Sequence, residues 1–333
     1  MKRRKRIAGT ILLLFALFCT GCNKQQAEST FLPFAFAGAD LPEPANSKIS
    51  RNTDFLRGRA AEVCIPSVKD AGQALPKDYG AYGLYNVAEN KVLEEYCIQE
   101  KIFPASTTKL MTALLTYKRC NLDEPVTISY SASHLGVEGA TLFGFSEGDK
   151  TTVRDLLSAM LVFSGNDAAI ALAEHVAGSV ESFIELMNEE AGRLGAVDTH
   201  FVNPHGLDDM EQYTTAYDIY LIFNELLSYP EFVSTISMSS CTIVYKDAKG
   251  NQKETTWYNT SHFQNNTYPL PKGIELIGGK TGTTPLAGFC NIIYFKDQNG
   301  TPYIVEVFRA SSYDNLYGKL SELMESVTIQ TDK

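Results

Sequence analysis

The sequence predicts an α+β fold, in which strands from both ends of the chain form one antiparallel sheet and a helical segment is inserted between them. Near residue 80 and again beyond residue 242, apolar and polar residues alternate with the period of two that is typical of strands. Between these regions, apolar residues recur with the 3.6-residue period of helices. Strands, then helices, then strands again favour an antiparallel sheet flanked by helices.

The expected elements can be assigned in chain order. Two β-like runs at 81–87 and 91–97 flank the turn residues Ala88-Glu89-Asn90 and predict a hairpin. A helix beginning at Pro104 follows at once, and a short strand is expected at 126–129. Helices are expected at 153–162, 167–176, 180–194 (with Gly195 as its C-cap) and 214–227. The last elements are strands at 274–282, 288–295 and 302–309 and a closing helix at 316–327.

Length and charge limit the class of protein. The 333 residues suffice for one large domain or two small ones, and 44% hydrophobic with 20% charged residues is ordinary for a globular protein. The formal net charge is −10. Because nucleic-acid-binding domains are more often basic, we expect no nucleic-acid partner.

The N-terminus has the pattern of a targeting segment. A basic stretch at 2–6 precedes an apolar run at 7–18, which is shorter than the roughly 18 residues that a spanning helix needs. The run ends at Cys19-Thr-Gly-Cys22, which resembles a bacterial lipoprotein signal with Cys22 as the lipidated residue, although Cys19 stands where that signal usually has Leu. We therefore expect an exported lipoprotein on the outer face of the cell membrane, with a secreted or signal-anchored protein as the alternatives.

Three segments follow from this interpretation. We expect a signal peptide at 1–21, a tether at 22–57 and one folded domain at 58–333, with no further β-rich domain after the closing helix. The tether lacks apolar periodicity and is interrupted by prolines. Cleavage would remove basic residues only, so the mature body would be more acidic and the lipid would provide the membrane attachment.

Seven cysteines are present, of which five lie beyond the N-terminal segment: Cys64, Cys97, Cys120, Cys241 and Cys290. An exported compartment permits disulfides, but an odd number leaves at least one thiol unpaired in a monomer. Their spacings match no zinc or redox motif. We expect mostly buried, small apolar residues, while a bridge between Cys64 and Cys97 stays open.

Three short motifs carry the chemistry. Ser106 and Lys109 are three residues apart at the start of a helix, so their side chains share one face, as a serine nucleophile activated by a lysine requires. Ser164-Gly-Asn166 lies at the break between two helices, and Gly278-Gly-Lys280-Thr-Gly282-Thr283 lies in a strand, where glycines often mark close approach of another backbone or a ligand. Taken singly, these motifs also fit a helix cap, an inter-helix turn and a glycine-rich strand end.

In this order the three motifs resemble those of the serine penicillin-recognising enzymes. Longer stretches extend the similarity over about residues 80–325, among them 104–113, 164–174, 199–208, 213–218 and 280–288. On these motifs the chain resembles the low-molecular-weight D-alanyl-D-alanine carboxypeptidases, the S11 serine peptidases. The resemblance implies the fold shared by serine β-lactamases and penicillin-binding-protein transpeptidases.

The resemblance also implies an activity and a role for each motif residue. The chain would remove the terminal D-alanine of peptidoglycan stem pentapeptides, would be acylated by β-lactam antibiotics, and would need no metal or cofactor. Ser106 would be the nucleophile, Lys109 would take its proton, and Ser164 would pass a proton to the departing D-alanine. Substrate would be bound by Asn166, Lys280, Thr281, Gly282 and Thr283, with the N–H groups of Ser106 and Thr283 forming the oxyanion hole.

Two other functions remain open at this point. A class A β-lactamase needs a Glu a few dozen residues after the second motif, whereas residues 191–207 contain no Glu and Asp198 is their only acid. A non-catalytic lipoprotein that kept the fold is the second alternative. His200 and His205 lack a third metal ligand at a convincing spacing, so we expect His205 to stabilise its loop, and Tyr213 and Asp218 to cap and pack the helix at 214–227.

Overall fold

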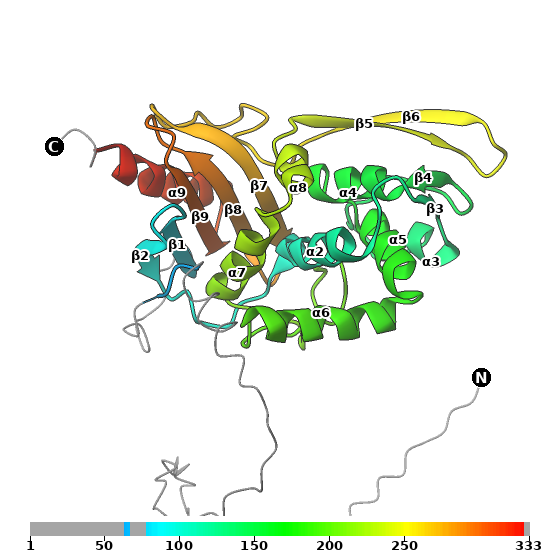
Figure 1. The fold of residues 1–333 in the computed structure, drawn as a ribbon, viewed down its shortest axis with the longest axis horizontal. Helices are drawn as coiled ribbons and strands as arrows, with labels where there is room; N and C mark the ends of the chain where they lie inside the picture. Colours follow the sequence, from blue (N-terminus) through cyan, green and yellow to red (C-terminus); the bar gives the residue numbers. More distant parts are fainter. Residues whose placement is uncertain (1–62, 67–77, 330–333) are drawn as a thin grey trace, which may run out of the picture. The chain divides into compact units, whose positions relative to one another are not determined.

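The structure is a computed structural model that describes residues 63–66 and 78–329. The predicted signal peptide, tether and lipidation residue Cys22 lie outside the described residues. A five-stranded antiparallel sheet has the order β2 (Lys91–Tyr96), β1 (Ala81–Asn86), β9 (Pro302–Ala310), β8 (Gly288–Lys296) and β7 (Glu275–Thr284). Because β1 pairs with β9, the sheet joins both ends of the described chain, as the sequence predicted (Figure 1).

Both faces of the central strands are buried. Successive side chains of a strand point to opposite faces. Ile293, Val305 and Val307 pack with the C-terminal helix α9 (Tyr313–Ile329), whereas Ile292 and Ile304 pack with the helices that precede the sheet. The sheet therefore separates α9 from the helical region, and each layer has its own apolar core (Figure 1).

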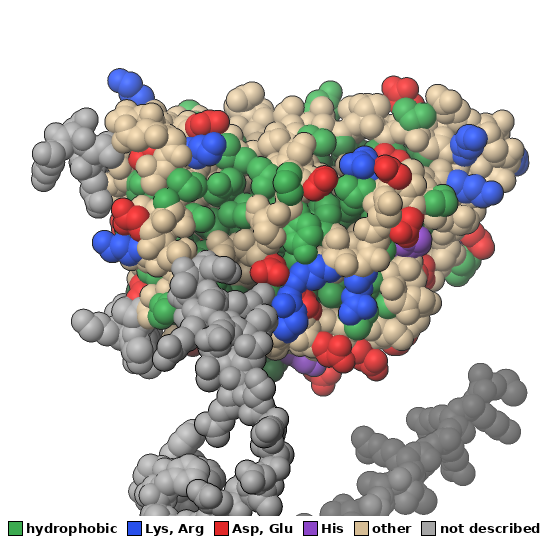
Figure 2. Space-filling view, in the orientation of Figure 1, with side chains coloured by type: hydrophobic (Ala, Val, Ile, Leu, Met, Phe, Trp, Pro, Cys, Tyr) green, Lys and Arg blue, Asp and Glu red, His purple; other side chains and the backbone are tan. Residues whose placement is uncertain are grey.

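The helical region lies between β2 and β7 in the chain. Its elements are the 3₁₀ helix η1 (Ala105–Thr108), α2 (Lys109–Arg119), α3 (Tyr130–Ser133), α4 (Val153–Val162), α5 (Asn166–Ala177), α6 (Val180–Leu194), α7 (Ala216–Leu226) and α8 (Pro230–Ile236). The bounds of α4 and α6 are those predicted. Side chains of Thr152 and Ser179 cap them, and Gly195 ends α6 with φ at 85°. The exposed acids of α6 form the acidic lower edge in Figure 2.

The predicted helix at Pro104 differs from the structure at its start. Ala105 has a φ of 47°, and the next turn is a 3₁₀ helix in which the N–H of Lys109 donates to the carbonyl of Ser106. Regular α-helix begins only at Lys109. The tighter turn places the Ser106 side chain ahead of the helix proper.

The structure contains a second sheet that the sequence did not predict. It has the order β3 (Pro125–Thr127), β4 (Lys150–Thr152), β5 (Ser240–Lys246) and β6 (Gln252–Tyr258), and only β3 corresponds to an expected strand. Figure 1 shows β5 and β6 as a long hairpin beside the helical region. Since β6 is largely exposed, its residues lack the buried alternation that would mark it as a strand.

The five cysteines of the described chain are all free thiols. Cys64, Cys97, Cys241 and Cys290 are buried, and Cys120 is half-buried, as expected for small apolar residues. The bridge between Cys64 and Cys97 that the sequence left open is not formed. Of the helices in the described residues, none combines the length and apolar character needed to span a membrane.

Candidate active site

Ser106 and Lys109 meet at the start of α2. Their Oγ and Nζ atoms are 3.0 Å apart, the hydrogen-bond contact that the three-residue spacing predicted. The Lys109 side chain is fully buried. Its amine donates to Asn166 Oδ1 at 2.6 Å and to the carbonyl oxygen of His205 at 2.6 Å. The first and second motifs are thus joined by one buried lysine.

These surroundings favour the neutral form of Lys109. Burial lowers the pKa of Lys109 well below its ordinary value, and the nearby charge of Lys280 lowers it further. A neutral amine has two N–H donors and one lone pair. The two donors match Asn166 Oδ1 and the His205 carbonyl, so the lone pair is left for the hydroxyl of Ser106.

Lys280 and Ser164 form a second lysine–serine pair. Lys280 Nζ lies 3.0 Å from Ser164 Oγ and 2.9 Å from the carbonyl oxygen of Thr281. Burial lowers the pKa of Lys280 to about 7. Ser164 has a φ of 72°, a conformation that non-glycine residues rarely adopt, at the junction of α4 and α5. The junction therefore points the Ser164 hydroxyl toward the third motif.

Asp167 anchors the loop that borders this junction. Its buried carboxylate accepts hydrogen bonds from the backbone N–H groups of Phe143, Gly144, Phe145 and Ala168. The backbone N–H of Asn166, the residue before it in the chain, donates to the carbonyl oxygen of Thr141 in the same loop at 2.9 Å. Sequence reasoning did not assign a role to Asp167, because the loop that it holds lies more than twenty residues away.

The close approach of η1 to β7 explains why the third motif has glycine at position 282. A Cβ added there would lie 2.9 Å from the backbone nitrogen of Ser106, 3.0 Å from Ala105 Cβ and 3.2 Å from the nitrogen of Thr107. The absence of a side chain lets β7 pack against η1. The backbone of the Lys280–Thr283 segment is therefore held next to the N–H group of the predicted nucleophile.

These elements enclose a pocket of about 140 Å³. Five predicted residues line it: Ser106, Ser164, Thr281, Gly282 and Thr283. Lys109, Asn166 and Lys280 are buried behind this lining. Five further residues were not predicted: Thr141, Thr260, Cys290, Tyr313 and Leu316. Thr260 is hydrogen-bonded to Thr281 through the two hydroxyls, which fixes the orientation of the Thr281 side chain.

Residues 203–206 form the loop whose His205 carbonyl oxygen accepts a hydrogen bond from Lys109. His205 Nδ1 accepts a hydrogen bond from the Leu207 N–H, as the loop-stabilising interpretation predicted. Burial, followed by the charge of Lys109, lowers the pKa of His205 to about 3, so its imidazole is neutral near pH 7. The expectation that Tyr213 and Asp218 cap the helix is wrong, because the Thr215 side chain caps α7. Tyr213 instead pairs with His200 through its backbone, and Asp218 accepts hydrogen bonds from the Asp198 N–H and the Thr199 hydroxyl.

Comparisons with known proteins agree with this arrangement. The family model described as D-alanyl-D-alanine carboxypeptidase matches residues 74–312. The chain is 34% identical to D-alanyl-D-alanine carboxypeptidase DacC of Escherichia coli K12, with 82% of this chain and 69% of that protein covered. It is 32% identical to D-alanyl-D-alanine carboxypeptidase DacF of Bacillus subtilis 168, with coverage of 96% and 70%.

A solved structure shows the same fold. The Streptomyces K15 DD-transpeptidase superposes with a TM-score of 0.69 at 28% sequence identity, covering 76% of this chain and 98% of that one. The predicted fold class is confirmed by this neighbour and by the two layers described above. From the family match and the relatives together, the chain belongs to the D-alanyl-D-alanine carboxypeptidase family, the S11 serine peptidases.

Proposed function

We propose that this chain is a serine-type D-Ala-D-Ala carboxypeptidase that removes the terminal D-alanine of peptidoglycan stem pentapeptides. One observation carries the proposal: the amine of fully buried Lys109 lies 3.0 Å from Ser106 Oγ, with its pKa well below the ordinary value. A lysine whose pKa is lowered in this way gives up its proton more readily, and in its neutral form it can act as the general base that makes an adjacent serine a competent nucleophile.

Acylation begins at Ser106. Its Oγ attacks the carbonyl carbon between the two D-alanines while Lys109 Nζ takes the hydroxyl proton. Negative charge then develops on the substrate carbonyl oxygen, which the N–H groups of Ser106 and Thr283 stabilise as an oxyanion hole. The close packing of Gly282 on the Ser106 nitrogen supports this assignment, because it holds both backbone segments on one side of the nucleophile.

Departure of D-alanine requires a proton on its amine nitrogen. In our proposal Ser164 relays to that nitrogen the proton that Lys109 took from Ser106, and Lys280, 3.0 Å from Ser164 Oγ, keeps its charge and orients the Ser164 hydroxyl. Asn166 holds Lys109 in place through its Oδ1 and presents its amide N–H₂ to the substrate. Lys280, with the hydroxyls of Thr281 and Thr283, provides positive potential and donors for the terminal carboxylate. Water then hydrolyses the ester on Ser106.

A β-lactamase would use the same nucleophile, but the residues that line the pocket argue against that function. None of the described residues that line the pocket is an Asp or a Glu. Asp198, the only acid of the 191–207 segment, is exposed and bonded to Asp218 through its backbone. In class A β-lactamases a Glu activates the water that hydrolyses the penicilloyl ester, and no carboxylate is found among the described residues that line this pocket, so we expect the drug to remain bound.

Release of D-alanine tests the activity. The full chain is incubated with a pentapeptide ending in D-Ala-D-Ala, and free D-alanine is measured. We expect release by the wild type, none by Ser106→Ala, and wild-type release by the control Ser228→Ala, which replaces an exposed serine after α7. Rapid turnover of benzylpenicillin without release of D-alanine would establish the β-lactamase instead. Tight penicillin binding with neither reaction would establish the non-catalytic alternative.

We further propose that the chain is exported and attached to the outer face of the cell membrane by lipid on Cys22. The basic and apolar N-terminal pattern and the Cys22 motif support this, as does a peptidoglycan substrate outside the cell. Detergent phase partitioning of the expressed protein tests the attachment. The wild type should enter the detergent phase and Cys22→Ser should not. Equal partitioning of both would favour the secreted or signal-anchored alternatives.

A further inference from the structure

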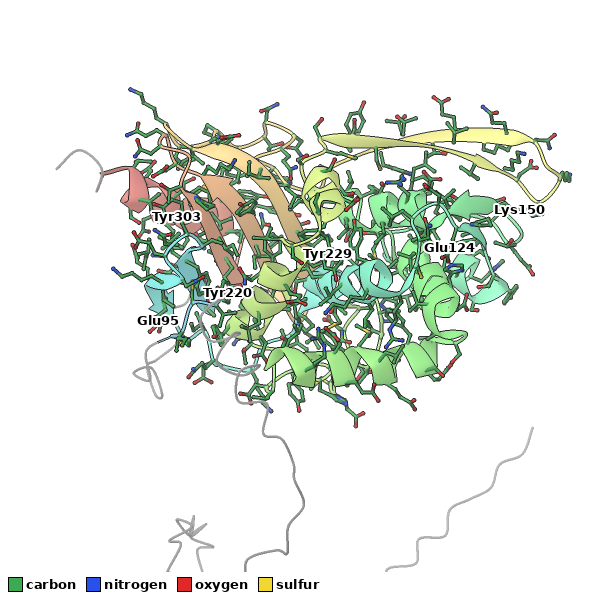
Figure 3. The ribbon with its side chains drawn as sticks, viewed as in Figure 1. Glu95, Glu124, Lys150, Tyr220, Tyr229 and Tyr303 are labelled. Carbon is green, nitrogen blue, oxygen red and sulfur yellow. The ribbon has the colours of Figure 1, made fainter. Side chains whose placement is uncertain are left out.

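A cysteine, a glutamate and a histidine meet at the opposite end of α2 from the catalytic pocket. Cys120 is the C-cap residue of α2, Glu124 directly precedes β3, and His175 lies in the last turn of α5. One donor atom from each residue lies within 4.8 Å of the other two. Figure 3 labels Glu124, which lies beside α5. None of these residues takes part in the proposed reaction.

The types of donor define which ion would fit. A thiolate, an imidazole nitrogen and a carboxylate oxygen are the donors of zinc sites, at bond lengths of about 2.0–2.3 Å. The Glu124 Oε2 and His175 Nε2 atoms are already 2.9 Å apart, so a small opening would admit an ion bonded to both. One thiolate and one carboxylate neutralise a divalent charge, and the three donors leave a fourth position for water.

The backbone next to Cys120 orients the carboxylate. The Asn121 N–H donates to Glu124 Oε1 at 2.8 Å, and the Glu124 N–H donates to the Asn121 carbonyl oxygen at 3.1 Å. This turn brings Glu124 back toward Cys120 and holds one carboxylate oxygen, which leaves Oε2 for His175. In metal sites, hydrogen bonds of this kind hold the ligating side chains in position. All three side chains are half-buried, so ions from solvent can reach them.

We propose that Cys120, Glu124 and His175 form a binding site for a divalent ion of the zinc class, separate from the catalytic pocket. When the ion binds, the thiol of Cys120 loses its proton to solvent, and His175 binds as the neutral tautomer that carries its proton on Nδ1. Bonds from the ion to His175 Nε2 and Glu124 Oε2 then replace the hydrogen bond between these two atoms. Sequence analysis did not find this site, because His175 is 55 residues from Cys120 and no short metal motif contains the set.

The position of the site gives it a structural consequence. At their first residues, α2 and α5 are joined by the contact between Lys109 Nζ and Asn166 Oδ1. Toward their last residues, the same two helices carry Cys120 and His175. An ion bound there would tie the far ends of the two helices that hold catalytic side chains at their near ends. Binding should therefore stabilise the folded helical region.

Cobalt absorption tests the site on the full chain, with Co²⁺ as the probe and Zn²⁺ as the competitor. We expect one equivalent of Co²⁺ to produce the d–d bands of four-coordinate cobalt and a sulfur-to-cobalt charge-transfer band. Stoichiometric Zn²⁺ should remove both. Cys120→Ser should abolish the charge-transfer band, and His175→Gln should weaken Zn²⁺ binding at least about 10-fold. Cys241→Ser, which removes a buried thiol that is not part of the trio, is the matched control and should bind as the wild type does.

A second measurement avoids dependence on how the variants fold. Zn²⁺ should slow alkylation of Cys120 in the wild-type protein, and it should raise the melting temperature of the wild type but not of Cys120→Ser/His175→Gln. Alkylation of Cys120 at an unchanged rate with Zn²⁺ present, or absence of a stoichiometric cobalt complex, would overturn the proposal. The trio would then be an ordinary half-buried ion pair of Glu124 and His175 beside a free thiol.

Discussion

Gly282 offers the sharpest test of how the pocket is assembled. In Gly282→Ala, the new Cβ would lie 2.9 Å from the Ser106 nitrogen, against an ordinary contact of at least 3.4 Å. The strand and η1 must therefore separate by about 0.5 Å, since the neighbouring atoms are backbone and a Cβ rather than a flexible side chain. This displacement moves the N–H group that we assign to the oxyanion hole together with the nucleophile.

The expected loss of rate follows from that displacement. Misplacing reacting groups by about 1 Å, or removing one oxyanion donor, costs about 10²-fold in rate. We expect acylation of Gly282→Ala by a fluorescent penicillin, followed by stopped flow, to slow by about 10²-fold, or ~2.7 kcal/mol of barrier. Overpacking should also cost about 1–3 kcal/mol of stability, measured by denaturation.

Gly318→Ala and Gly192→Ala are the matched controls. Both glycines lie in helices, and a Cβ at either would meet no atom within 4 Å. Alanine should leave their acylation rates unchanged and stabilise each helix by about 0.5–1 kcal/mol. If Gly282→Ala acylates within about threefold of the wild type at an unchanged melting temperature, the close packing of β7 on η1 does not position the nucleophile.

Three further predictions concern the buried polar groups. Lys109→Met should slow acylation by about 10³-fold, because the general base is lost; a decrease of less than tenfold in the same stopped-flow assay would contradict its role. The pKa of Lys280 is about 7 when folded against 10.5 for the free side chain, so between these values the unfolded chain binds more protons and stability rises with pH. In denaturant titrations from pH 7 to 8.5, the free energy of unfolding should therefore rise with pH in the wild type and rise less steeply in Lys280→Met. The two slopes should differ by up to about 1.4 kcal/mol per pH unit, and equal slopes would show that Lys280 stays charged. Asp167→Ala should lower the free energy of unfolding by about 2–4 kcal/mol, because four backbone N–H groups lose their acceptor, whereas Asp167→Asn keeps one acceptor oxygen and should lose less; a loss below about 1 kcal/mol for the alanine variant would contradict the anchoring role.

Much of the fold was predictable because local chemistry sets it. The N-caps Thr152 and Ser179 and the C-cap Gly195 stand beside clear 3.6-residue periods, so α4 and α6 were found at their correct bounds. A sheet built from both ends of the chain followed from the strand patterns there, and the structure forms it through the pairing of β1 with β9. The second sheet was missed because β4 has three residues and β6 is mostly exposed, which leaves tertiary contacts to decide both.

The contacts of the catalytic pocket were likewise predictable only in part. The contact of Ser106 with Lys109 depends on helix geometry and could be predicted from spacing. The pairing of Lys280 with Ser164 spans 116 residues, and the acceptor that His205 offers to Lys109 is a backbone oxygen, which no side-chain pattern encodes. The order of the motifs, through the family resemblance, predicted which residues form the site. The hydrogen bonds between these residues could be known only from the folded chain.

The direct test of the central claim is the site of covalent acylation by benzylpenicillin. The full chain is treated with the drug, and its mass is measured intact and after digestion. Our account predicts one adduct of the drug's mass on the peptide that contains Ser106, no adduct on Ser106→Ala, and a much slower adduct on Lys109→Met. Absence of an adduct on the wild type, or an adduct on Ser164 or another residue, would contradict the assignment of Ser106 and Lys109 as nucleophile and base.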